Sequence, residues 1–444
     1  MAKPNHPVRR GLTRFFGFVL RTYFRKVEVV GDIPGPDVRG RLFGANHVNA
    51  LVDPILVVTS AACSISPIAK NTLWNIPFFK WMLDLVDAVP IVRRRDDPTK
   101  SAKDNDAVFE RVATHLVSGG NILIFPEGTS HNEPYLVPFR SGAGRMLARA
   151  KSAGGQGLEV QAVGLEFDER EIFRSRVLVV FGKVVRIDDL DGLDGDALAA
   201  RITETLHDRL TELVVEGRTW EERLLITRVA ELFANEADDA SLEGRNVLGR
   251  QVEAARALLS DEDPILAEVR ETVTAYYDAL TSARTSDAVV RDPAGHLTPR
   301  SPLALVLLLA TLPLALFGSV LYFAPYQVPR LVARATKQQS TDLTSTYKLG
   351  AGLLAFPLWA AAACTLAALF VPGKTALEPV LACLVVLSSP FAALAWLDRL
   401  PRLSDTFGLL LGNGRGRLPH LRELRKRALD ALERGRQKTS PTPP

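Results

Sequence analysis

Residues 41–54 read RLFGANHVNALVDP, an apolar run that leads directly into a histidine and, six positions later, an aspartate. The run at 41–45 predicts a buried β-strand, and Asp53 with Pro54 predicts a helix start with the acid as N-cap. Positions six apart lie on different faces of a helix, so His47 belongs in the loop before it. A neutral imidazole oriented by a carboxylate can take a proton from an alcohol, because an unperturbed histidine titrates at about pH 6.5.

Further short runs rich in β-branched residues surround this stretch and alternate with polar helical segments, which predicts an α/β domain. The predicted strands are 26–30, 41–45, 121–125, 160–167 and 177–181, and a helix is predicted at 107–117. Residues 216–300 are polar and show helical spacing of apolar positions, such as Ile226, Val229, Ala230 and Phe233. They predict a helical connector without evident chemistry.

Charge and cysteine content exclude several classes of protein. A net charge of +4, with 23% charged residues, gives no support to nucleic-acid binding and leaves a lipid bilayer as the expected acidic partner. The chain has three cysteines, two of them in apolar runs, so neither a disulfide framework nor a zinc cluster is expected. No metal site is predicted, because the other histidines have no carboxylate or cysteine at ligand spacing.

The first 26 residues predict an amphipathic helix with apolar side chains from Leu12 to Tyr23 at helical spacing and arginines on another side. Two interpretations stay open: a helix that lies in the membrane interface, or a first helix packed on the domain core. No long apolar stretch precedes Arg21, so a cleaved secretory signal is not expected.

Residues 301–398 predict a membrane-embedded region, followed by a basic cytoplasmic tail at 399–444. Its apolar stretches, 303–323, 349–371 and 376–397, are each close to the roughly 20 residues that cross a bilayer. The basic loop 330–348 and the basic tail both indicate the cytoplasmic side, which three spans cannot satisfy. Either 303–323, interrupted by Pro313 and Gly318, is re-entrant or in-plane and two spans remain, or three spans leave one basic cluster on the less favoured side.

A second motif follows the first by about seventy residues, and its sequence is FPEGTS at 125–130. Gly128 leaves backbone N–H groups open to a phosphate. Further blocks lie at 69–78, 88–93 and 138–142, and the order and spacing of all of them resemble the glycerolipid acyltransferase family. The resemblance covers about 25–190 and implies an acyltransferase domain at 27–215 with the mixed-sheet fold of glycerol-3-phosphate acyltransferases.

The resemblance also implies roles for individual residues. His47 would be the general base and Asp53 would hold its imidazole. The acceptor phosphate would be bound by Arg93, Glu127, Gly128, Thr129 and Ser130, with Asn46, Lys70 and Arg140 as weaker candidates. Guanidinium suits phosphate best, whereas a glutamate would repel it and is better suited to orienting a neighbour or an acceptor hydroxyl. His131 is interpreted as a solvated loop histidine.

The implied reaction moves a fatty acyl group from acyl-CoA or acyl carrier protein to glycerol 3-phosphate, dihydroxyacetone phosphate or 1-acylglycerol 3-phosphate, without a cofactor. The expected protein is a multi-pass membrane enzyme of phospholipid biosynthesis with its catalytic domain facing the cytoplasm. Two departures favour an alternative, a membrane-tethered scaffold that keeps only the fold. Five residues instead of the common four separate His47 from Asp53, and Ala162 replaces a proline in the last block. A metal-dependent phosphoesterase is a second rival.

Overall fold

The computed structural model describes residues 7–75, 77–92, 106–190, 192–293, 306, 308–336, 343–370, 377–400 and 414–439. The chain forms two compact units, Met1–Arg223 and Leu224–Pro444. Arg93 lies outside the described residues.

A seven-stranded sheet forms the centre of the first unit, in the order β1-β7-β6-β2-β5-β3-β4. Its strands are β1 (Lys26–Gly31), β2 (Arg41–Ala45), β3 (Ser66–Lys70), β4 (Val89–Ile91), β5 (Ile122–Ile124), β6 (Glu159–Phe167) and β7 (Arg176–Arg186). The β6–β7 pair is antiparallel and the other pairs are parallel. The predicted mixed α/β sheet is therefore confirmed. The altered fourth block lies in β6, where Ala162 is buried and pairs with Gly44 of β2.

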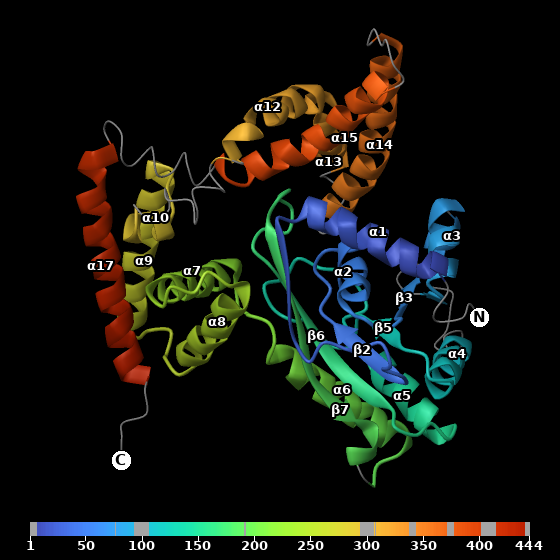
Figure 1. The fold of residues 1–444 in the computed structure, drawn as a ribbon. Helices are drawn as coiled ribbons and strands as arrows, with labels where there is room; N and C mark the ends of the chain where they lie inside the picture. Colours follow the sequence, from blue (N-terminus) through green and yellow to red (C-terminus); the bar gives the residue numbers. More distant parts are fainter. Residues whose placement is uncertain are drawn as a thin grey trace. The chain divides into compact units, whose positions relative to one another are not determined.

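Helices cover both faces of this sheet (Figure 1). The helices are α1 (Pro7–Tyr23), α2 (Val52–Ser60), α3 (Pro77–Leu85), α4 (Asp106–Val117), α5 (Gly142–Ser152) and α6 (Gly195–Thr211), with short 3₁₀ turns at Asn71–Asn75 and Ile187–Asp189. The core of one face joins Leu42 and Ile122 of the strands to α4, α5 and α6. Their neighbours Phe43 and Leu123 point to the opposite face, because side chains alternate along a strand.

The parallel pairing of β2, β5, β3 and β4 determines where the sequence blocks meet. Carboxyl ends of neighbouring parallel strands lie at the same edge of a sheet, and ligand sites of α/β proteins form there. His47 follows β2, the FPEGTS block follows β5, and Lys70 ends β3. Blocks that are far apart in the sequence thus converge on one edge.

Helix α1 packs one of its sides on the core, as the second interpretation of the amphipathic N-terminal segment expects. Phe16, Leu20 and Tyr23 are buried in the unit, whereas Phe15 and Phe18 are exposed. Buried Arg9 donates to the carbonyl of Ile65 at 2.8 Å. One side of the helix is therefore core, and an apolar strip remains on the outside.

The second unit begins with the helical connector and also contains the C-terminal helix. Its connector helices are α7 (Trp220–Glu236), α8 (Leu242–Ala257), α9 (Pro264–Ala283) and α10 (Asp287–Arg291), and the C-terminal helix is α17 (Gly414–Thr439). A shared core contains Leu232, Val273 and Val290 from the connector together with Leu421 and Leu432 from α17. The chain therefore returns to the connector after the apolar region.

The apolar region contains α12 (Leu312–Leu321), α13 (Phe323–Thr336), α14 (Thr344–Phe370) and α15 (Leu377–Leu397). Helices α14 and α15 are long and apolar enough to cross a membrane, whereas α12 is shorter. The expected interruption at Pro313 is confirmed, because the helical residues 308–310 end at Thr311 and α12 begins at Leu312. The expected interruption at Gly318 is wrong, because Gly318 lies inside α12 and allows close contact with the backbone of Ser389. A further break falls at Tyr322, and most of the predicted basic loop 330–348 that is described is helical.

Candidate active site

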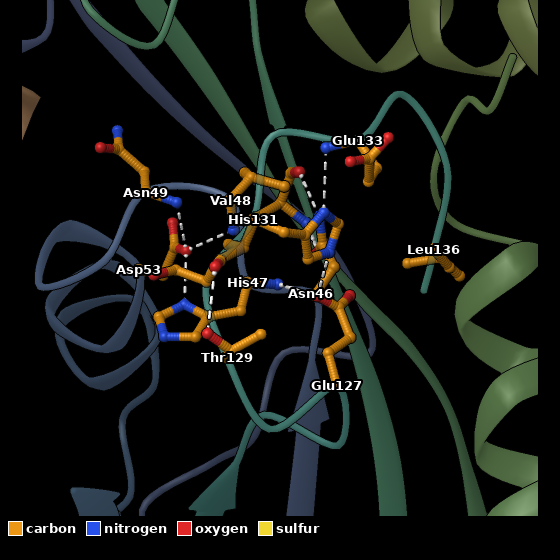
Figure 2. A network of polar contacts seen from close by, with 12 residues as sticks. Asn46, His47, Val48, Asn49, Asp53, Glu127, Thr129, His131, Glu133 and Leu136 are labelled. Atoms are coloured by element: carbon orange, nitrogen blue, oxygen red, sulfur yellow. Dashed lines mark hydrogen bonds and ion pairs between the residues drawn. The ribbon is translucent and has the colours of Figure 1, made fainter. Parts of the chain in front are cut away.

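His47, in the loop between β2 and α2, and Asp53, in the first turn of α2, form a buried pair (Figure 2). Nδ1 of His47 lies 2.9 Å from Oδ2 of Asp53, and the side chains are 10% and 0% exposed. An ionised carboxylate only accepts hydrogen bonds, so this contact requires the proton on Nδ1. Nε2 then carries the lone pair and is the ring atom that can accept a proton.

The imidazole is held on its face as well as at its edge. The ring of Phe125 stacks on it, with the ring centroids 4.0 Å apart and the planes 19° from parallel. Phe125 follows β5 directly, so the parallel pairing of β5 with β2 brings the two rings together. The orientation of His47 is fixed by two contacts that do not use Nε2.

Asp53 does not cap the helix, and the prediction of an N-cap role is wrong. Helix α2 begins one residue earlier, at Val52, and has no side-chain cap. Oδ2 of Asp53 instead accepts the backbone N–H groups of Val48 and Asn49 at 2.8 and 2.7 Å, in addition to the imidazole. These bonds fold the loop around the carboxylate. Oδ1 is buried and has no partner among the described residues.

The additional residue between His47 and Asp53 is accommodated in this loop. Ala50 has a φ of 36°, in the left-handed region that residues with a Cβ adopt at an energetic cost. The tight turn there keeps the imidazole within hydrogen-bond distance of Asp53 despite the longer spacing. The departure from the common spacing therefore leaves the His–Asp pair intact.

Asn46 anchors the loop to the neighbouring strand. Its side-chain amide donates to the carbonyl of Leu165 at 3.0 Å, and its side-chain oxygen accepts the N–H of Leu165 at 2.7 Å. Both bonds are buried and imitate a further step of the β2–β6 ladder. Asn46 therefore fixes the start of the loop in which His47 lies.

The FPEGTS block contacts the His47 loop through Glu127. Oε2 of Glu127 accepts the backbone N–H of His47 at 3.3 Å, and the residue is 2% exposed. Gly128 has a φ of 77°, which favours glycine. The hydroxyl of Thr129 donates to the carbonyl of Ser130 at 3.2 Å. Glu127, Gly128, Thr129 and Ser130 thus lie beside the pair, with the carboxylate directed at the main chain of His47.

Arg140 stands next to this block. A Cβ on Gly128 would lie 2.5 Å from Nε of Arg140, so the guanidinium packs directly against the glycine. The side chain is exposed and makes no hydrogen bond or ion pair with the residues that the structure describes. Lys70 lies at the same sheet edge, at the end of β3, whereas Arg93 is outside the described ranges. Among the described phosphate-binding candidates, Arg140 therefore has a guanidinium that is free to bind a phosphate.

The sequence interpretation missed two residues that reinforce the site. His131 is not a solvated loop residue, because its side chain is 10% exposed and its Nε2 bonds to Glu127. The Glu–His spacing of four residues was the available signal. Arg170 donates to the carbonyls of Val48 at 2.9 Å and His131 at 3.4 Å. Nothing local in the sequence points to Arg170, because it comes from the loop after β6.

Residues 26–165 match the family model described as Acyltransferase. This part of the chain is an acyltransferase domain. The acyltransferase domain contains His47, Asp53 and the FPEGTS block, so the resemblance read from those motifs is confirmed.

Several curated proteins are similar to parts of this chain. Glycerol-3-phosphate O-acyltransferase 2 of Saccharomyces cerevisiae is 25% identical over 283 residues, 57% of this chain and 37% of the relative. Lyso-ornithine lipid O-acyltransferase of Pseudomonas aeruginosa is 30% identical over 36% of this chain and 55% of the relative. 1-acyl-sn-glycerol-3-phosphate acyltransferase of Borreliella burgdorferi is 29% identical over 28% of this chain and 47% of the relative. The alignments span about half of these relatives or less.

Proposed function

We propose that the protein is a membrane-bound O-acyltransferase that transfers a fatty acyl group from acyl-CoA or acyl carrier protein to a phosphorylated glycerol in phospholipid biosynthesis. The observation that carries the proposal is the buried His47–Asp53 pair, in which Nε2 is left without a hydrogen bond to the described residues. The acceptor is glycerol 3-phosphate, dihydroxyacetone phosphate or 1-acylglycerol 3-phosphate. The relatives that act on glycerol 3-phosphate and its 1-acyl derivative support this class of acceptor.

The pair supplies general base catalysis. Nε2 of His47 takes the proton of the acceptor hydroxyl as its oxygen attacks the thioester carbonyl, and Asp53 stabilises the imidazolium that forms. Collapse of the tetrahedral intermediate breaks the C–S bond and leaves an ester. The imidazolium then returns its proton to the departing thiolate. No residue is covalently modified, and the histidine ends the cycle in its starting state.

The scaffold alternative predicts a site that no longer holds its catalytic geometry. Three features argue against the scaffold: the buried pair, the stacked Phe125 ring and the buried Asn46 side chain. Burial of a carboxylate and an imidazole lowers the stability of the fold, so a protein without the reaction has no reason to keep them. The enzyme is therefore the better-supported proposal.

A thiol-release assay with several acceptors tests the function. Purified protein receives acyl-CoA or acyl carrier protein with glycerol 3-phosphate, dihydroxyacetone phosphate, 1-acylglycerol 3-phosphate or lyso-ornithine lipid, and the products are separated by chromatography. We expect thiol release with a phosphorylated acceptor, without inhibition by EDTA. Absence of thiol release with every pair would favour the scaffold, and EDTA-sensitive phosphate release would favour the phosphoesterase.

The same assay tests Arg140 as a phosphate ligand. Loss of a charge-assisted hydrogen bond is worth about 1.5–3 kcal/mol, so Arg140→Ala is expected to raise the acceptor KM by about tenfold or more. Arg111→Ala, which removes an exposed guanidinium from α4, serves as the matched control. An unchanged acceptor KM in the Arg140 variant would remove this residue from the phosphate site.

For the membrane region we propose two spans, α14 and α15, and a re-entrant segment formed by α12 and α13. Trp396 near the end of α15 donates to Thr311 before α12 at 3.3 Å, and Tyr322 after α12 donates to the carbonyl of Val386 at 3.3 Å. Helix α12 therefore runs antiparallel along the last part of α15, and its end reaches the middle of that helix.

Helix α13 then leads back toward the beginning of α14. Tyr322 stacks on Phe356 with the ring centroids 6.2 Å apart, and Pro329 packs near Gly352. The end of α15 and the beginning of α14 lie on one side of a two-helix hairpin. The segment formed by α12 and α13 starts beside the end of α15 and ends toward the beginning of α14. It therefore enters and leaves the bilayer on the same side.

The contacts of α17 support an even number of crossings. Buried Asp287 of α10 pairs with Arg425 of α17 at 2.7 Å, within the core that α17 shares with the connector. Connector and C-terminal helix therefore lie on the same side of the membrane. Because the tail is basic, we assign both to the cytoplasmic side, together with the catalytic domain.

Cysteine labelling of intact cells tests this topology. Single cysteines at Arg334, Lys374 and Glu423, in a background without the three native cysteines, would be treated with an impermeant maleimide. We expect labelling from outside only at 374, and labelling at 334 and 423 only after permeabilisation. Labelling of 334 and 423 from outside, with 374 labelled only after permeabilisation, would establish three spans.

A further inference from the structure

A second imidazole–carboxylate pair lies beside the first (Figure 2). Nε2 of His131 is bonded to Oε2 of Glu127, and the two side chains are 10% and 0% exposed. The same carboxylate oxygen accepts the backbone N–H of His47. The second pair therefore contacts the main chain of the residue whose imidazole is the proposed base.

The hydrogen bonds of His131 determine its tautomer. The backbone N–H of Glu133 donates to Nδ1 of His131 at 3.1 Å, so Nδ1 carries a lone pair. The proton of a neutral ring is then on Nε2, where it is donated to Glu127. Both ring nitrogens are occupied, and His131 has no free nitrogen with which to accept a substrate proton.

The two motif loops are joined at several further points. The backbone N–H of His131 donates to the carbonyl of His47 at 3.1 Å, so both main-chain polar groups of His47 are held from the second motif. Arg170 bridges the carbonyls of Val48 and His131. A displacement of the second loop must therefore move the main chain that carries the base.

Glu127 depends on His131 for its place in this network. Its carboxylate makes no ion pair with a lysine or arginine within the described parts of the chain, and Oε1 is buried without a partner there. A buried carboxylate needs donors to offset its desolvation. The imidazole N–H of His131 and the peptide N–H of His47 are the donors that Oε2 has.

We propose that His131 is a positioning residue, whose imidazole N–H holds Glu127 so that this carboxylate fixes the main chain of His47 for proton transfer. The proposal rests on the acyl transfer proposed above and assigns the Glu127–His131 pair to orienting the base instead of binding phosphate. Misplacement of a catalytic group by about 1 Å can cost up to about 100-fold in rate. Loss of the pair should therefore lower kcat and leave acceptor binding largely unchanged.

Two substitutions at His131 separate hydrogen bonding from packing. His131→Phe keeps the ring but removes the donor, and we expect kcat to fall by about 10- to 100-fold with the acceptor KM within about twofold. His131→Gln places an amide N–H near the position of Nε2 and should recover most of this loss. Glu127→Gln combined with His131→Phe should cost much less than the product of the single effects, because the two residues act as one unit. His420→Phe, at an exposed position of α17, is the matched control.

Three outcomes would overturn the proposal. They are native kcat in His131→Phe, an increase in acceptor KM at constant kcat, and a folded His131→Gln variant that is as impaired as His131→Phe. Nitrogen-15 NMR of labelled histidines provides a readout that does not depend on activity. The ring of His131 should show a proton on Nε2, and His131→Phe should shift the ring resonances of His47. An inactive native protein that shows these signals would refute acyl transfer and leave the positioning contact standing.

Discussion

His47→Ala is expected to lower kcat for acyl transfer by about 10²- to 10⁴-fold, the usual contribution of a general base. The variant removes Nε2, the ring atom that the Asp53 contact leaves free to accept a proton. Folding should be retained, because Asp53 keeps the backbone N–H groups of Val48 and Asn49 as donors. Thiol release with saturating acceptor and donor is the measurement.

A companion variant separates the base from its orientation. Asp53→Asn keeps the size of the side chain but removes the negative charge that fixes the tautomer and stabilises the imidazolium, so kcat should fall by orders of magnitude here also. His420→Ala, in which an exposed histidine is replaced in the same way, should behave as the native protein. Near-native turnover of folded His47→Ala would refute the proposed mechanism.

Asp287→Ala is expected to destabilise the second unit by about 3–5 kcal/mol, the usual cost of removing one partner of a buried ion pair. The Asp287 carboxylate is fully buried and accepts from Tyr276 at 2.6 Å, Asn235 at 2.7 Å and Arg425 at 2.7 Å. Burial and the adjacent carboxylate raise the pKa of Tyr276, so its phenol remains a donor. Burial opposes the charge of Arg425, but Asp287 and Glu236 outweigh it and raise the pKa. Without Asp287, the guanidinium of Arg425 keeps only its ion pair with the exposed carboxylate of Glu236.

Thermal denaturation and limited trypsin digestion measure this effect. The variant should melt at a lower temperature and release peptides from α17 faster than the native protein, because the helix loses its buried contact with α10. Glu433→Ala removes an exposed carboxylate from the same helix and should change neither quantity. An unchanged melting temperature and digestion rate in Asp287→Ala would contradict the proposed contribution of the network.

The central strand and the connector helices follow from local sequence, but two strands do not. The apolar run 41–45 is strand β2 at the predicted residues, because every one of its residues is buried. Strands β3 and β4 were missed because each is short and contains a proline, Pro67 or Pro90, which ordinarily counts against a strand. Pairing with parallel neighbours decides their conformation, and that pairing is not a local property.

The candidate site shows the same division between local and long-range information. The motifs indicated His47 and Asp53 as a pair. The Asp–Pro pattern also predicted that Asp53 is the N-cap of the helix, which is wrong, because a carboxylate can accept N–H groups of the preceding loop as readily as those of the first helical turn. His131 lies in a polar stretch that indicates exposure, yet Glu127 and the loop of His47 cover it. Contacts between residues about eighty positions apart cannot be read from either motif alone.

The return of α17 to the connector also sets an order of events during synthesis. Leu421, Ala428 and Leu432 complete a core whose other buried members come from helices that end before residue 292. Ribosomes add about 5–20 residues per second, so this core must wait several seconds, while the apolar helices are produced, for its last component. Until α17 arrives, the apolar face of α9 is open to chaperones and proteases, and a chain truncated before residue 414 would keep it open permanently.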